Sequence, residues 1–222
     1  MLFSTKMFEP IFDLISEYFL QERYSAEFQS AREEYFYKTG KVFEDEPLFE
    51  SRMASCFEWY LIDRCLWDTG IPPVRLYRLA FGKNLREEDQ KALLSFEEST
   101  HSIFSFVKRK GSQVFLKECL SGKEFIVFDD QQPSIQEGDI LDARLIYLGG
   151  KNVLTESMWV HPREALSFIK KEVKSKTFQN KEMYTAFLFD LAYMKLKKDR
   201  FSHVPFDQIY NWETLRKDKV EA

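Results

Sequence analysis

The chain has 222 residues, of which 44% are hydrophobic and 31% charged, and its formal net charge is −4. This balance is typical of a soluble globular protein and excludes both intrinsic disorder and a membrane-embedded fold. The 22 phenylalanines predict a large core rich in rings, while the net acidity argues against a protein that depends on extensive contact with nucleic-acid phosphates.

Residues 1–100 repeat apolar positions at helical spacing, and this part of the chain carries most of the acidic excess. Residues 45–47 (DEP) predict the start of a helix that continues to about Trp67 and is apolar on two faces. Within it, Cys56 and Cys65 are expected to be buried thiols. Shorter helices are predicted over residues 73–81 and 85–98. Together these helices predict an N-terminal helical bundle.

The hydrophobic period changes after residue 100, and residues 101–161 predict a small antiparallel sheet. Glycine-containing turns at residues 110–111, 121–123 and 149–150 separate short apolar runs, which is typical of hairpins. Five strands are expected, over residues 102–108, 113–118, 124–128, 140–147 and 152–160. Five strands of this length can curl into a barrel that leaves few open edges.

Residues 162–222 predict C-terminal helices that pack on both preceding parts, so the fold class is α+β with one integrated core. The helix over residues 181–199 is apolar on two sides. Such a helix contacts two layers of its own chain, or one layer and a second subunit. The residues predicted for a partner interface are Tyr184, Phe187, Phe189 and Tyr193.

The three cysteines, Cys56, Cys65 and Cys119, form no C-x-x-C pair, which excludes a disulfide framework and a cysteine zinc site. The N-terminus lacks the pattern of a signal peptide, and no apolar run is long enough to span a bilayer. A cytoplasmic protein without membrane association is therefore expected.

No motif for nucleophilic catalysis, phosphate binding or dinucleotide binding is present, so we assign no catalytic residue, cofactor or metal. His101 and His161 flank the strand region and are expected to approach each other in space. Together with Asp129 or Asp130 they have the chemistry to hold a metal ion. The alternative is that each histidine forms hydrogen bonds at a junction between elements.

Lys108, Arg109 and Lys110 form a basic run beside phenylalanines in the predicted strands. Cations interleaved with rings are typical of surfaces that bind single-stranded nucleic acid. The alternative is that these rings point into the barrel and the basic run only solvates a turn.

Two stretches, residues 57–63 (FEWYLID) and 137–145 (EGDILDARL), resemble a region of bacterial proteins that carry a SEC-C motif. The similarity covers residues 50–175 and implies the same helical-plus-β fold without implying an activity. The zinc-binding tail of those proteins has no counterpart here, because residues 176–222 contain no cysteine and only His203.

The leading functional hypothesis is a non-enzymatic interaction or adaptor module that binds a protein partner or forms a homo-oligomer. The first alternative is a single-stranded nucleic-acid-binding protein that uses the barrel. The second is an enzyme with a site assembled from scattered residues, which a cleft holding His101 or His161 beside a carboxylate would support.

Overall fold

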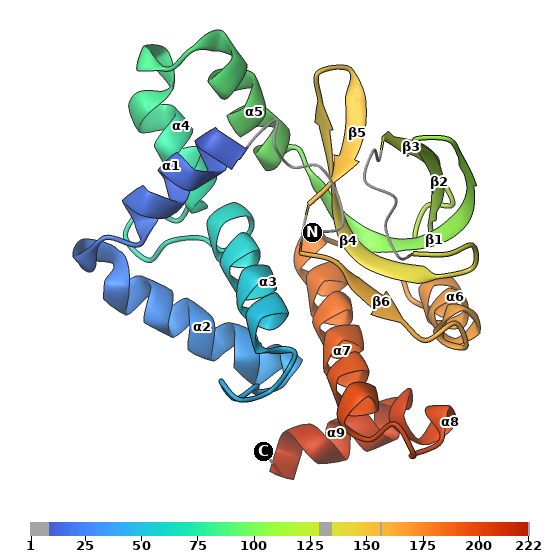
Figure 1. The fold of residues 1–222 in the computed structure, drawn as a ribbon. Coiled ribbons are helices and arrows are strands. Elements are labelled where there is room, and N and C mark those ends of the chain that lie inside the picture. Colours follow the sequence, from blue (N-terminus) through green and yellow to red (C-terminus); the bar gives the residue numbers. More distant parts are fainter. Residues whose placement is uncertain (1–8, 129–134, 156, 222) are drawn as a thin grey trace.

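The computed structural model describes residues 9–128, 135–155 and 157–221, and it has an α+β fold with helices before and after a closed barrel (Figure 1). Asp129 and Asp130 lie outside the described residues. Within the described ranges, no helix combines the length and apolar character needed to cross a lipid bilayer.

The N-terminal part is helical, as the apolar spacing predicts. Its α-helices are α1 (Glu9–Phe19), α2 (Ser25–Thr39), α3 (Phe49–Ile62), α4 (Pro73–Phe81) and α5 (Glu87–Glu97), with 3-10 turns η1 (Glu22–Tyr24) and η2 (Gly82–Asn84). Pro73 occupies the first turn of α4, where its missing N–H costs nothing. Three carboxylates in the first turn of α5 complement the helix dipole.

Helix α3 ends at Ile62, five residues before the predicted end at Trp67. Just beyond the end of the helix, Arg64 forms ion pairs with Glu27 and Glu34 of α2. The prediction that Cys65 is buried was therefore wrong, since it lies beyond the helix and is exposed, whereas Cys56 is buried as expected.

The strand region forms a closed barrel. Its strands are β1 (Thr100–Lys110), β2 (Gln113–Glu118), β3 (Glu124–Phe128), β4 (Ile140–Leu148) and β5 (Lys151–Leu154), and β6 (Trp159–His161) is added beside β4. The strand order is β1-β2-β3-β5-β4, and pairing of β1 with β4 closes the barrel. The rings of Phe104 and Phe106 fill the interior together with aliphatic side chains from the other strands.

Two features differ from the predicted antiparallel sheet of five strands. The β3–β5 pair is parallel, because the other four pairs of the closed five-stranded barrel are antiparallel and β3 and β5 therefore run in the same direction. The predicted strand over residues 152–160 is interrupted, so that β5 pairs with the C-terminal half of β4 and β6 pairs with its N-terminal end. Strand β1 has a bulge between Phe106 and Lys108, which lets it bend from β4 to β2.

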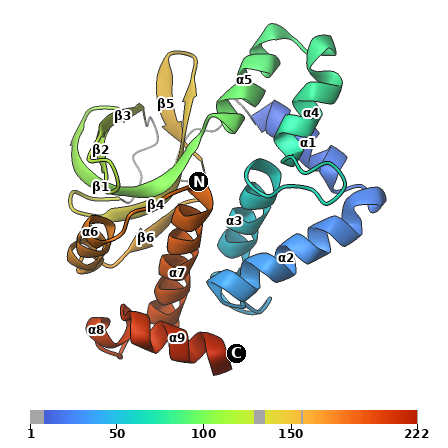
Figure 2. The same ribbon diagram turned by 180° about the vertical axis from the view of Figure 1, so that it is seen from behind.

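The C-terminal helices are α6 (Ala165–Ser175), α7 (Lys181–Arg200), α8 (Phe206–Ile209) and α9 (Trp212–Glu221). Helix α7 runs between the barrel and the N-terminal helices, as the views from the front and from behind both show (Figures 1 and 2). The side chain of Asn180 caps its first turn by accepting a hydrogen bond of 2.9 Å from the Met183 N–H.

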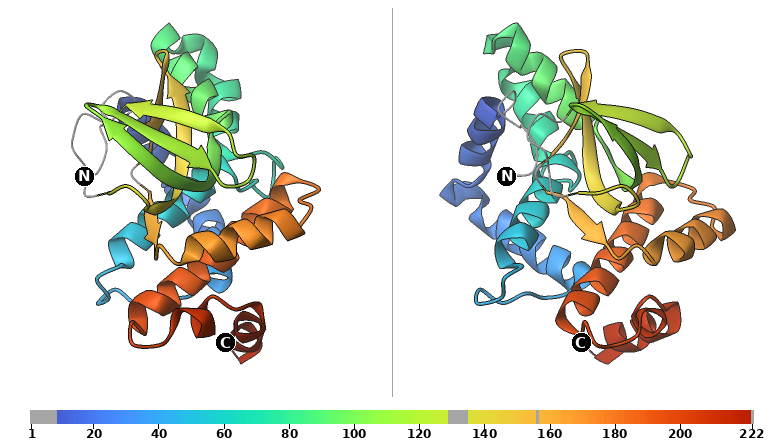
Figure 3. Two further views of the ribbon diagram at one scale, coloured as in Figure 1. Left: turned by 90° about the vertical axis from the view of Figure 1, so that its right-hand side faces the viewer. Right: turned by 45° about the vertical axis from the view of Figure 1, so that its right-hand side comes forward.

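The outer side of β4 is covered by helices. Ile146 and Leu148 pack into the core of the N-terminal helices, and Ile140 packs with α6 and α7. Among the described residues, no helix lies in front of the side of the barrel formed by β2 and β3, as Figure 3 shows in its left view. The barrel therefore has one covered side and one open side.

Candidate functional site

The open side of the barrel carries rings and lysines. We call it the open barrel face and define it by Lys108, Lys110, Phe115, Lys117, Ile126, Phe128 and Lys151. These residues come from β1, β2, β3 and the start of β5. The strand alternation explains their direction, because Val114, Leu116 and Val127 point into the barrel core and their neighbours along the strands point outward.

The register brings the residues of the open barrel face together. Phe115 pairs with Lys108 on one side and with Ile126 on the other. Phe128 lies opposite Gln113 at the end of β3. Ile126 is 42% exposed, which is unusual for a large aliphatic side chain in the middle of a sheet.

Two of these lysines lie over rings. The Lys108 ammonium is 4.9 Å from the centre of the Phe115 ring, and the Lys151 ammonium is 4.8 Å from the centre of the Phe128 ring. Lys110 and Lys117 are exposed on the same face. Among the described residues of this face, the nearest carboxylate in the register is Glu124, which pairs with Lys117. The open barrel face is therefore basic although the whole chain is acidic.

The basic run predicted for nucleic acid is divided by the strand alternation. Lys108 and Lys110 lie opposite Phe115 and Gln113 and belong to the open barrel face. Arg109 lies opposite Val114, a residue of the barrel core, and its guanidinium is 5.9 Å from the centre of the Phe106 ring inside the barrel. Two of the three predicted residues thus share one surface.

Turns border the open barrel face at both ends. Gly111 in the β1–β2 turn has φ +56°, and Gly149 and Gly150 in the β4–β5 turn have φ +58° and +79°. Glycine adopts this conformation without the strain that a side chain would add. Tyr147, just before the second turn, is among the most exposed rings of the chain.

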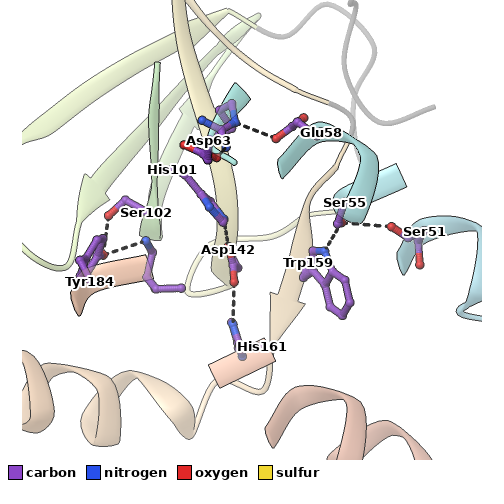
Figure 4. A network of polar contacts seen from close by, with 12 residues as sticks. Ser51, Ser55, Glu58, Asp63, His101, Ser102, Asp142, Trp159, His161 and Tyr184 are labelled. Atoms are coloured by element: carbon purple, nitrogen blue, oxygen red, sulfur yellow. Dashed lines mark hydrogen bonds and ion pairs between the residues drawn. The ribbon is translucent and has the colours of Figure 1, made fainter. Parts of the chain in front are cut away.

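The covered side of the barrel contains a polar network (Figure 4). Arg144 of β4 is buried and donates hydrogen bonds of 2.9 Å to Glu58 of α3 and to the Ser99 hydroxyl. It also donates to Asp63, whose other oxygen is 2.7 Å from the Lys181 ammonium of α7. Burial acts to raise the pKa of Asp63, but Arg144 and Lys181 outweigh it and lower the pKa to about 2. The network joins the barrel to both sets of helices.

The two histidines that flank the strand region meet at one carboxylate of this network. His101 Nε2 lies 2.6 Å from Asp142 Oδ1, and His161 Nε2 lies 3.9 Å from Asp142 Oδ2. His161 is also within 2.8 Å of the Tyr210 hydroxyl, which ties β6 to the C-terminal end of the chain. Burial acts to raise the pKa of Asp142, yet the two histidines hold it well below the usual value of a carboxyl.

Little space remains at this junction. A slot of about 20 Å³ is lined by His101, Asp142, Arg144 and Trp159, among others. One water molecule needs roughly 10–15 Å³, so the slot has room for a water molecule but not for a substrate. Across the described residues, no group of three His, Cys, Asp or Glu side chains is arranged to hold a metal ion. The enzyme hypothesis required a cleft that holds a histidine beside a carboxylate. His101, His161 and Asp142 lie together, but the described residues around them leave room for no more than this slot.

The four residues predicted for a partner interface lie on α7. Tyr184 and Phe187 pack with α6 and α9, and the Tyr184 hydroxyl lies 2.7 Å from the Ser102 hydroxyl. Phe189 packs between Tyr35 and Trp59 in the N-terminal core. Tyr193 is half-buried. Most of the apolar surface of α7 is therefore covered by its own chain, and a role of these residues in partner binding stays a prediction.

The strand order of the barrel matches a known topology. The order β1-β2-β3-β5-β4, with β1 paired to both β2 and β4, is that of the OB-fold, a five-stranded Greek-key barrel. The model of the family of unknown function DUF7986 matches residues 12–204, and the chain belongs to this family. No curated protein and no solved structure matches the chain. The resemblance of residues 57–63 and 137–145 to SEC-C-associated proteins stays a prediction.

Proposed function

We propose that the protein binds single-stranded nucleic acid on the open barrel face. The observation that carries the proposal is the pair of surface rings, Phe115 and Phe128, each with a lysine ammonium less than 5 Å from its centre. Bases stack on such rings whatever their sequence, and each stacked base contributes about 1–3 kcal/mol to binding. When a base stacks on a ring, the ammonium group of Lys108 or Lys151 can leave that ring and bind a neighbouring phosphate of the same strand.

The position of this surface on the barrel supports the proposal. In OB-type barrels, oligonucleotides and oligosaccharides bind across strands 2 and 3 between the loops that join strands 1–2 and 4–5. Phe115, Ile126 and Phe128 lie on these two strands, and Lys110 and Lys151 lie beside these two loops. Four lysines favour a phosphate-bearing ligand over a neutral saccharide. The strand positions are shared with other OB-type barrels, whereas the rings and charges belong to this chain.

A single strand suits the surface better than a duplex. The rings can stack only on bases that are not already stacked in a double helix. The four lysines neutralise few phosphates, so binding by charge alone would be weak in a chain of net charge −4. We therefore expect modest affinity, little sequence preference and a clear preference for single strands.

Fluorescence anisotropy with a labelled oligothymidylate of about 12 nucleotides, a typical site size for such a barrel, tests the proposal. The variant Lys108→Glu/Lys151→Glu reverses both lysines that lie over rings. It should lose most of the binding, and the slope of log affinity against log salt should fall by about 0.7 for each lysine.

The matched control is Lys83→Glu/Lys217→Glu, which makes the same charge change at two exposed lysines away from the barrel. This variant should bind like the wild type apart from a small general electrostatic effect. Binding that both double variants weaken equally, or an absence of binding by the wild type at low salt, contradicts the proposal.

A further inference from the structure

A groove between the C-terminal ends of α2 and α7 lies far from the open barrel face. Its volume is about 480 Å³, and its walls include Tyr37, Tyr193, Leu196 and Phe201. A second hollow of about 510 Å³ adjoins it. Phe36, Tyr37, Lys41 and Phe43 line both hollows. We call the two together the α2–α7 groove.

Three large rings of the groove are exposed. Tyr37 is 71% exposed, Phe43 is 65% exposed and Phe201 is 45% exposed. Single exposed rings are common on protein surfaces, but several around one hollow mark an interaction surface. Aromatic side chains also contribute much of the binding energy at protein interfaces. The groove therefore offers apolar surface that the chain itself does not cover.

The groove is rigidly built. Arg52 donates hydrogen bonds to the carbonyl oxygens of Thr39 at 2.5 Å and of Ala192 at 3.3 Å, which ties the end of α2 to α7. Arg200 holds the Glu46 carboxylate at 2.5 and 2.8 Å and the Lys41 carbonyl at 2.5 Å. These contacts fix the segment that carries Phe43. A partner would meet a preformed surface and lose less entropy on binding.

The groove is basic within an acidic protein. Its walls contain Arg32, Lys41, Lys197 and Arg200 against Glu33 and Asp218, a net charge of +2 that becomes +1 when Glu46, the partner of Arg200, is included. Lys197 is paired with Asp218, and Arg200 with Glu46. Within the described part of the chain, the side chains of Lys41 and Arg32 form no hydrogen bond or ion pair. Their charges are available to a ligand.

We infer that the α2–α7 groove binds an acidic segment of a partner protein, with an apolar side chain between Tyr37, Phe43 and Phe201 and carboxylates on Lys41 and Arg32. A hollow walled by rings accepts a protruding side chain, as at the anchor sites of protein interfaces. Opposite charge at the rim adds specificity and speeds association.

The same features disfavour two other occupants. A symmetric dimer through the groove would place the same cations of both copies against each other. For nucleic acid, Asp218 and Glu46 already hold Lys197 and Arg200, which leaves two of the four wall cations to contact a run of phosphates. An acidic peptide brings no cations of its own against those of the groove. It also needs fewer cations than a run of phosphates, because its carboxylates are separated by other side chains that can enter the hollow.

Selection from a displayed library of random dodecapeptides tests the inference on the full chain. The library is panned in parallel on the wild type and on Tyr37→Ala/Phe43→Ala, whose exposed rings can be removed without opening the core. Peptides retained only by the wild type should be rich in Asp and Glu and contain an aromatic or aliphatic anchor. A Lys41→Glu variant should bind these peptides at least ten-fold more weakly.

The ring control is Phe115→Ala, which removes an aromatic side chain from the open barrel face and should leave peptide binding unchanged. Selected peptides that are basic, or that bind Tyr37→Ala/Phe43→Ala as well as the wild type, would overturn the inference. So would a concentration-dependent dimer in sedimentation velocity that Tyr37→Ala/Phe43→Ala abolishes, or an oligothymidylate that competes for the groove.

Discussion

His101 and Asp142 lie on neighbouring strands of the barrel, with 2.6 Å between Nε2 and Oδ1, at the place where the barrel meets α3 and α7. His161 approaches the other oxygen of the same carboxylate from β6. One buried negative charge is thus shared by two imidazoles at the junction of the barrel with both sets of helices. A buried charge that loses its partners is strongly destabilising, so loss of this contact should lower the stability of the fold.

The variant Asp142→Asn should destabilise the protein at neutral pH. The substitution keeps the size of the side chain but removes the charge that both histidines face, and breaking a buried pair costs about 3 kcal/mol. Urea unfolding at neutral pH measures the loss. A midpoint equal to that of the wild type would show that the contact contributes nothing to stability.

The stability of the fold should decline in acid below about pH 4, where unfolded carboxyl groups begin to take up protons. Asp63 has a pKa lowered to about 2, and the pKa of Asp142 is also lowered. Because the folded carboxyls bind protons less readily than the unfolded ones, their contribution is complete above the unfolded pKa and is lost as the pH falls through the folded pKa. The stability difference between the wild type and Asp142→Asn should therefore shrink from about pH 4 downward.

Arg144→Met should unfold at a much lower denaturant concentration than the wild type. It leaves Glu58 and Asp63 without the cation between them, and loss of one partner of a buried ionic network costs about 3–5 kcal/mol. Arg144→Lys should restore only part of the lost stability, because the compact ammonium lacks the rigid planar fork of N–H donors with which the guanidinium reaches Glu58, Asp63 and Ser99 at once. The exposed pair of Arg86 with Asp89 supplies the control, and Arg86→Ala should leave the midpoint unchanged.

Two phenylalanines of the barrel should respond in opposite ways to replacement by alanine. Phe104→Ala opens a cavity in the barrel core and should cost about 3–5 kcal/mol of stability. Phe115→Ala lies on the open barrel face and should leave stability nearly unchanged, while it weakens oligothymidylate binding by about 1–3 kcal/mol. Thermal unfolding and anisotropy on the same two samples separate the effects.

Gly40→Ala should destabilise the junction of α2 and α7. Gly40 has φ +92°, and a Cβ there would lie 2.8 Å from Leu196 Cδ2. Positive φ alone costs a residue with a side chain about 1 kcal/mol. Gly70→Ala isolates that cost, because Gly70 has φ +66° with open space around it. The larger fall in melting temperature should occur for Gly40→Ala, and equal falls would mean that Leu196 moves aside freely.

The sequence was sufficient for the helices and for the barrel strands, because both follow from the period of apolar residues and from glycine turns. It could not show that β3 and β5 run parallel, since this pair joins distant segments. It also could not divide the run 108–110 between two faces, because the bulge after Phe106 resets the alternation.

The polar network was missed for a related reason. Asp142 and Arg144 alternate with apolar residues in β4, a pattern that ordinarily indicates a strand with one solvated side. Here helices cover that side, and the partners of Asp142 and Arg144 come from α3, β1 and β6 and from Asp63 just after α3. The sequence did contain one signal for burial. Asp142 and Arg144 carry opposite charges two residues apart, and long apolar runs flank them in the same strand.

All helices of the described chain leave the β2–β3 side of the barrel clear (Figure 3). A polymer lying across Phe115 and Phe128 would meet no helix of the described residues at either end of this surface. The length of the nucleic acid would then determine how many protein molecules bind to one strand, and successive copies would bind next to one another along it. Titration of longer oligomers should accordingly give a stoichiometry that rises in proportion to their length.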